Sequence, residues 1–274
     1  MAELISFFHL DFMRQALLAS FLAAIACGII GSLVVVNRMV FLAGGIAHAA
    51  YGGVGLSLFF RLPMLPVVTS FSVLCALLLG IITFRRQHHA DALVSALWSI
   101  GMALGALLVS LTPGYQSDLM GYLFGSILTI LPSDIMVMFI LDGVLLIWIW
   151  WFYREIMAVS YDLEYARVLG IPATLIYYLI LVLTSVAIIL LMRFVGLVLV
   201  LAMLSIPSYL AEHWSGSLKT MMFLSSVFSF VFMVLGLWIS YELNLPAGPV
   251  MIIVSGVSFS VVEVTRYMAL RKKS

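Results

Sequence analysis

Two side chains that could do chemistry stand inside strongly apolar stretches of this sequence. His48 lies within the stretch 39–56, which is rich in glycine and alanine, and Asp142 lies in the middle of the stretch 134–153. A polar or ionisable group in apolar surroundings is costly unless it faces protein or water, so it marks a functional site by default. The structural alternatives are a hydrogen bond from His48 to a neighbouring backbone carbonyl, and a polar contact from Asp142 to another helix. The residues alone leave these alternatives open.

The residues around His48 predict a close contact between helices. Gly44, His48 and Gly52 are spaced by four, so they share a broad face if the segment is helical. Small residues allow helix backbones in a membrane to approach each other closely. The glycines of this stretch are Gly44, Gly45, Gly52, Gly53 and Gly55.

A proline interrupts another apolar stretch, residues 194–211. Pro207 has no N–H to donate, so a helix here leaves the Met203 carbonyl without its usual partner. Ser205 and Ser208 are placed to compensate for that loss or to line a cavity. The alternative is an ordinary proline kink.

The most polar segment between apolar stretches is SYDLEYARVLGIP, residues 160–172. It predicts a short helix, because Asp162 and Glu164 favour a helix N-terminus and Gly170 can adopt the left-handed conformation that ends one. Pro172 would stop continuation. The alternative to a functional role is a simple interfacial helix that connects two membrane spans.

The elements that must position these residues are membrane-spanning helices. Of the 274 residues, 65% are hydrophobic and only 9% are charged, whereas about a quarter of the residues of a soluble domain are charged. Lipid must therefore be part of the solvent of this chain. We expect an all-α fold, a polytopic transmembrane helical bundle of eight or nine spans. Nine candidates lie at 12–36, 39–60, 64–84, 91–112, 134–153, 172–192, 194–211, 218–241 and 247–264. Residues 118–130 are apolar but short, and predict a surface helix or a re-entrant segment.

The basic residues predict the orientation, because cytoplasmic loops carry an excess of Lys and Arg. Nine spans with a cytoplasmic C-terminus place ten basic residues inside and three outside. Those inside are Arg38, Arg85, Arg86, Arg154, Arg167, Lys219, Arg266, Arg271, Lys272 and Lys273; those outside are Arg14, Arg61 and Arg193. An eight-span arrangement with the N-terminus inside would keep the same C-terminal half.

Several functional classes lack their motifs in this sequence. It contains no GxxxxGK[ST] phosphate loop, no HExxH and no GxSxG. A formal net charge of +1 argues against a broad surface for nucleic acid. The arginine-rich helix of a voltage sensor is also missing.

Five sequence blocks in order resemble the permease subunits of zinc, manganese and iron ABC importers, over nearly the whole chain. RMVFLAGGIAHAAYGGVGL resembles the glycine-rich segment of the family, which carries an alanine-flanked histidine. GYLFGSIL (residues 121–128) resembles its LFG block, and DLEYARVLGIP its cytoplasmic loop. VGLVLVLAMLSIPSYLA resembles its proline-containing helix, and LNLPAGPVMIIVSG its final span.

The resemblance implies a single transmembrane permease domain, residues 1–274, of the type II ABC importer kind. Two copies would form the translocation path, and an external binding protein would deliver the metal. The chain itself would not be an enzyme, since a separate ATPase would dock on a cytoplasmic coupling helix at about residues 160–171. The coupling residues would be Asp162, Glu164, Ala166, Arg167 and Gly170. The implied location is the plasma membrane of a prokaryote, with the C-terminus in the cytoplasm.

One position departs from the family pattern and affects the expected metal site. Many members carry an aspartate four residues before the histidine, where the two can share a metal, but this chain has Gly44 there. The substitute ligand would be Asp142 or a second His48 from a partner copy. Imidazole suits zinc, and also manganese or iron with added oxygen ligands. We expect a weak, transient site on His48, with zinc first, in which the metal is transported substrate and no cofactor is permanently bound. Residues expected to line or pack beside the path are Gly44, Gly52, Ser205 and Pro207.

Two other functional classes remain open. A secondary transporter would use an ion gradient and would need no ATPase partner. A membrane sensor or assembly factor would bind a partner protein and move no solute.

Overall fold

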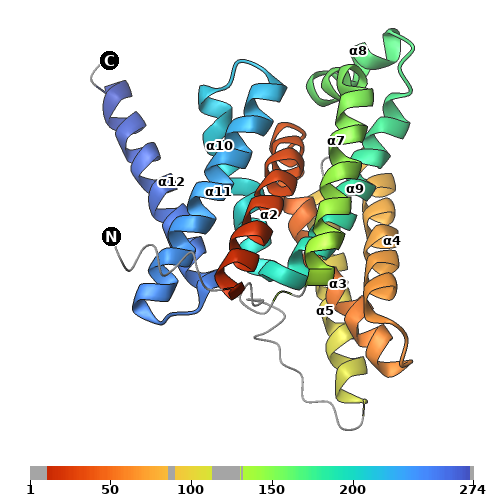
Figure 1. Cartoon of the computed structure of the whole chain (residues 1–274). Helices are drawn as coiled ribbons and strands as arrows, with labels where there is room; N and C mark the ends of the chain where they lie inside the picture. The colour runs from red at the N-terminus through yellow and green to blue at the C-terminus, as the bar shows by residue number, and fades with distance from the viewer. Residues whose placement is uncertain (1–10, 86–89, 113–129, 131, 272–274) are drawn as a thin grey trace. The chain divides into compact units, whose positions relative to one another are not determined.

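The computed structural model describes residues 11–85, 90–112, 130 and 132–271, and every regular element within them is a helix (Figure 1). Nine helices of this described part are long and apolar enough to cross a membrane, whereas α8 has only six residues. The prediction of an all-helical polytopic bundle is therefore confirmed. The helices are α2 (Asp11–Val36), α3 (Val40–Phe59), α4 (Met64–Arg85), α5 (Ala90–Ser110), α7 (Pro132–Tyr161), α8 (Leu163–Val168), α9 (Ala173–Val195), α10 (Leu197–Trp214), α11 (Leu218–Leu243) and α12 (Ala247–Arg271).

One predicted boundary differs clearly from the structure. The sequence predicts a span that ends at residue 153, but α7 continues to Tyr161. A break at Phe152 (φ −108°, ψ 20°) separates the apolar part from a more polar helical extension. The predicted short segment 118–130, and with it the block 121–128, lies outside the described residues except for Ile130.

The chain divides into two compact units, each made of segments that are distant in sequence. The first comprises residues 1–32, 124–143 and 194–274, and the second comprises residues 33–123 and 144–193. Among the described residues, the first unit holds most of α2, the start of α7 and α10 to α12. The second holds α3, α4 and α5, the remainder of α7, and α8 and α9.

Glycines on α2 allow close packing within the first unit. A Cβ atom added to Gly28 would lie 2.6 Å from the Cα atom of Ser226 on α11. A Cβ atom on Gly31 would overlap the carbonyl oxygen of Leu204 on α10. Both distances are far shorter than real carbon contacts, so α2 approaches these helices only because the two positions lack side chains.

The second unit is built around α3, which packs against α4 and α5. A Cβ atom on Gly53 would lie 3.0 Å from the Cα atom of Val68 on α4. At the end of α2 that belongs to this unit, the Asn37 side chain donates a 3.0 Å hydrogen bond to the Ser160 hydroxyl of α7. The start of the polar segment 160–172 is thus tied to the corner between α2 and α3.

Large apolar side chains project from the outer faces of the long helices. On α7, Phe139 is 65% exposed, Ile147 61% and Trp150 81%. Such exposure would be unfavourable in water over so many helices, but it suits contact with lipid. The chain is therefore a multi-pass membrane protein.

Candidate functional site

His48 lies near the middle of α3, and its imidazole ring is half-buried. Helix α3 is bounded by Arg38 and Arg61, which both have positive φ angles (56° and 54°) and so lie outside the helical conformation. The Nδ1 atom of His48 is fully enclosed and has no hydrogen-bond partner among the described residues. The structural alternative, a hydrogen bond from this nitrogen to a backbone carbonyl, is not seen in that part of the chain.

The imidazole ring of His48 instead stacks on the indole of Trp98 from α5. The ring centroids are 4.1 Å apart and the planes differ by 8°. The indole Nε1–H donates a 2.9 Å hydrogen bond to the sulfur of Met102, one turn further along α5. Trp98 was not among the residues predicted from the sequence. The sequence did contain a signal for it. Tryptophan is usually enriched at the ends of membrane spans, whereas Trp98 lies well inside its helix.

Close backbone contacts bring α3 and α5 together beside this stack. A Cβ atom on Gly101 would lie 2.7 Å from the Cα atom of Ala49, the neighbour of His48. A Cβ atom on Gly52 would lie 3.0 Å from the Gly101 carbonyl oxygen, and at the same distance from the ring of Phe71. Gly44 differs, since a Cβ atom there would meet no atom of the described residues within 4 Å. Gly52 therefore lies at a tight contact, and Gly44 faces open space.

Asp142 is buried in α7, with a 4% exposed side chain, and neither of its carboxylate oxygens has a hydrogen-bond partner among the described residues. It belongs to the first unit, whereas His48 belongs to the second. Their pairing in one site therefore stays a prediction. No group of three or more His, Cys, Asp or Glu side chains in the described ranges could hold a metal ion.

Pro207 is buried inside α10, and the two nearby serine hydroxyls have other partners than the Met203 carbonyl. Ser205 donates back to the Leu201 carbonyl of its own helix at 2.8 Å. The Ser208 hydroxyl lies 2.7 Å from that of Ser225 on α11. Ser208 thus contributes to helix–helix packing, and the part of Ser205 and Pro207 in a translocation path stays a prediction.

The polar segment after α7 folds into the short helix α8. Asp162 is its N-cap, and the carboxylate accepts a 2.9 Å hydrogen bond from the backbone N–H of Tyr165. Glu164 and Arg167 form a 2.6 Å ion pair on the solvent side, where its contribution to stability is small. Ala166 is the one fully buried residue of α8, so this side faces the protein. The cap satisfies a backbone group that a six-residue helix would otherwise leave unpaired.

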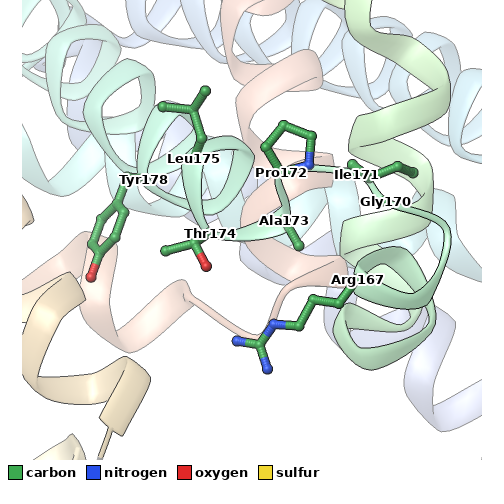
Figure 2. Close-up of a pocket in the computed structure, with 8 residues that line it drawn as sticks. All are labelled: Arg167, Gly170, Ile171, Pro172, Ala173, Thr174, Leu175 and Tyr178. Atoms are coloured by element: carbon green, nitrogen blue, oxygen red, sulfur yellow. The ribbon is translucent and has the colours of Figure 1, made fainter.

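Gly170 closes the segment with a φ angle of +75°, which an L side chain rarely adopts. The turn leads into α9 and borders an open cavity of about 630 Å³ (Figure 2). Figure 2 shows three polar side chains among the lining residues, those of Arg167, Thr174 and Tyr178, and the lining is mostly apolar. The residues that line it are Arg167, Gly170, Ile171, Pro172, Ala173, Thr174, Leu175 and Tyr178.

Comparison with known proteins places this architecture in a family. The family model described as "ABC 3 transport family" matches residues 9–265. The chain is 34% identical over 251 residues to a "Probable metal transport system membrane protein" of Chlamydia trachomatis, covering 89% of this chain and 86% of that one. It is 28% identical over 249 residues to the "Manganese transport system membrane protein MntC" of Listeria monocytogenes, covering 91% and 89%.

A solved structure agrees with this match in fold as well as in sequence. The structure described as PsaBC from Streptococcus pneumoniae in complex with Fab has a TM-score of 0.83 and 29% identity to this chain, covering 95% of this chain and 94% of that one. The family model matches nearly the whole chain, including α3 with His48 and the segment that forms α8. This chain therefore belongs to the ABC 3 transport family.

Proposed function

We propose that this chain is the permease subunit of an ATP-driven importer that moves a divalent metal ion across the plasma membrane of a prokaryote. The observation that supports this most is the match to the family model over residues 9–265. Relatives named for metal or manganese transport cover about nine-tenths of the chain. In this proposal a separate ATPase hydrolyses ATP, an external protein delivers the metal, and two copies of this chain form the path.

We infer that His48 is a transient ligand for the metal in the path. It lies at the middle of a membrane helix, and its Nδ1 atom has no hydrogen-bond partner in the described part of the chain. A neutral imidazole binds first-row divalent metals through a ring nitrogen. We include Asp142 as a second possible ligand, because its buried carboxylate also has no hydrogen-bond partner among the described residues. A site with few ligands would release its ion readily, as a transport path requires.

Two arguments about the identity of the metal favour different ions. Imidazole chemistry favours zinc, which was the first choice from the sequence. The name of the Listeria monocytogenes relative, a manganese transport system membrane protein, favours manganese instead, at 28% identity over about nine-tenths of each chain. Uptake should therefore be measured for both ions in the same preparation, and we expect each to compete with the other.

The test is uptake of radioactive Mn²⁺ and Zn²⁺ by proteoliposomes that contain the complete complex, with His48→Ala and Asp142→Asn. We expect His48→Ala to lose most of the uptake, because nothing else in α3 offers a nitrogen ligand. His213→Ala is the matched control, since the Nδ1 atom of that ring already bonds to the Tyr209 carbonyl of its own helix at 2.7 Å. Loss of uptake in His48→Ala alone would show that Asp142 is not a ligand. Wild-type uptake in both variants would rule out the metal site.

A second test adds a possible ligand instead of removing one, by placing at position 44 the aspartate that many family members carry there. Position 44 is four residues before His48 and has room for a side chain. Gly44→Asp should therefore lower the metal concentration that gives half-maximal uptake, because a carboxylate then shares the helical face with the imidazole. An unchanged value would count against metal binding at His48.

A further inference from the structure

We propose that Trp98 is a positioning residue that holds the imidazole ring of His48 in the orientation for metal binding, and that Met102 in turn holds Trp98. This inference rests on the proposed role of His48 as a metal ligand. It adds two residues of α5 that do not themselves touch the ion. The supporting observations all lie within the second unit of the chain.

The first observation is that no hydrogen bond from the described residues anchors the enclosed ring nitrogen of His48. A histidine that binds a metal usually donates its other ring N–H to a carbonyl or carboxylate, which fixes the orientation of the ring. The enclosed Nδ1 atom of His48 has no such partner among the described residues. The parallel contact with Trp98, at 4.1 Å and 8°, can restrain the ring in its place.

The geometry of the stack leaves the metal-binding edge of the ring free. A metal approaches an imidazole nitrogen in the plane of the ring, along the lone pair. Trp98 covers a face of the ring and therefore competes with neither nitrogen. Because Nδ1 is the enclosed nitrogen, Nε2 is the one that an ion could reach. The stack thus restrains the ring as a hydrogen bond at the other nitrogen would, without occupying a ligand position.

The stack also favours the metal-bound form of the ring. An imidazole that binds a divalent cation carries more positive charge than a free neutral imidazole. The indole face is electron-rich and attracts positive charge, and tryptophan is the best of the aromatic side chains in this respect. Trp98 should therefore stabilise the ion-bound state of His48 more than the empty state, which is the difference that an apparent affinity reports.

Trp98 is itself fixed from two sides. Its Nε1–H donates to the Met102 sulfur at 2.9 Å, which restrains rotation of the indole. The backbone contact between Gly101 and Ala49 sets the separation of α3 and α5 within one turn of both rings. The backbone contact thus limits the distance between the rings, and the Met102 contact, on an exposed part of α5, favours one orientation of the indole.

The experiment compares Trp98→Leu, Trp98→Phe and Met102→Leu in the complete transporter, with radioactive Mn²⁺ and Zn²⁺ as probes. Trp98→Leu removes the aromatic face, whereas Trp98→Phe keeps a face and loses the N–H. Trp150→Leu is the matched control, because that indole is 81% exposed on α7 and belongs to no site. Each variant is first checked for assembly and for its thermal unfolding temperature.

We expect Trp98→Leu to raise the half-saturating metal concentration by about three- to ten-fold, the range that aromatic contacts support, with little change in the maximal rate. Trp98→Phe should recover most of that loss, and Met102→Leu should show a smaller rise. The double variant His48→Ala with Trp98→Leu should be no worse than His48→Ala, because Trp98 acts through His48.

Other outcomes would overturn the inference, and they separate it from the proposed function. If His48→Ala abolishes uptake while Trp98→Leu keeps a normal half-saturating concentration, Trp98 does not position the ring although the metal site stands. A lower maximal rate at an unchanged half-saturating concentration would assign Trp98 a structural role only. Normal uptake by His48→Ala would instead rule out the metal site itself, whatever the uptake by Trp98→Leu.

Discussion

At the scale of single residues, the two glycines on either side of His48 have different surroundings. Gly52 faces the Gly101 carbonyl and the ring of Phe71, each 3.0 Å from an added Cβ atom, whereas Gly44 faces open space. Both lie on the same helix and in register with His48. The same substitution at the two positions therefore separates the effect of helix contact from that of helix propensity.

We expect Gly52→Leu to destabilise the protein by about 1–3 kcal/mol or more, because the side chain would overlap neighbouring backbone. Gly44→Leu should be neutral or slightly stabilising, since glycine is a poor helix former. The measurements are the yield of folded protein in detergent and its thermal unfolding temperature. Equal stability of the two variants would contradict the close contact at Gly52.

At the scale of elements, α8 is a short helix that depends on its ends. Asp162 caps one end, and the left-handed Gly170 turns the chain toward α9 at the other. Since Ala166 alone is buried, most of the helix surface is free to contact a partner. A rigid, exposed helix between two spans is suited to transmit movement from a separate subunit to the membrane.

Gly170→Val and Glu164→Lys should uncouple ATP hydrolysis from transport while the chain still inserts into the membrane. Valine is strained at a φ angle of +75°, and lysine at position 164 removes the ion pair with Arg167 and opposes the helix dipole. Gly216→Val is the control, because that glycine has open space and no positive φ angle. ATP hydrolysis and metal uptake are measured in the same reconstituted complex, and normal transport by both test variants would exclude coupling through α8.

At the scale of the whole molecule, the distribution of basic residues predicts which side of the membrane each loop faces. Leu62 and Val168 are exposed, at 51% and 84%, and lie in connections predicted to be on opposite sides. The chain has two cysteines, Cys27 and Cys75, which are buried and free. Replacing both with alanine gives a background in which single cysteines report their own accessibility.

In that background, a membrane-impermeant maleimide added to intact cells should label Leu62→Cys and not Val168→Cys. Permeabilised cells should label both, which shows that each thiol is reactive. The reason is that nine spans with a cytoplasmic C-terminus place Arg61 outside and Arg167 inside. Labelling of Val168→Cys in intact cells would contradict the predicted orientation and would show that α8 does not lie on the cytoplasmic side.

The sequence by itself determined the elements, because the features that define them are local. Continuous apolar runs predict membrane helices wherever they are long enough, and nine such helices are found among the described residues. The end signals of the polar segment were also local: Asp162 caps α8 and Gly170 has a positive φ angle. The break at Phe152 was missed, since no proline or glycine marks it.

Only the tertiary structure decided which residues meet, because contacts between helices depend on the rotation and depth of each helix, which local sequence patterns do not reveal. The glycine pattern predicted a close contact on α3, but not that Gly52 would face Gly101 while Gly44 faces open space. The position of His48 was known, but its stack on Trp98, 50 residues away, required the packing of α3 on α5. Likewise, Ser208 was predicted to compensate for Pro207 or to line a cavity, and its contact with the Ser225 hydroxyl was not predicted, because only the tertiary fold brings this second buried hydroxyl within reach.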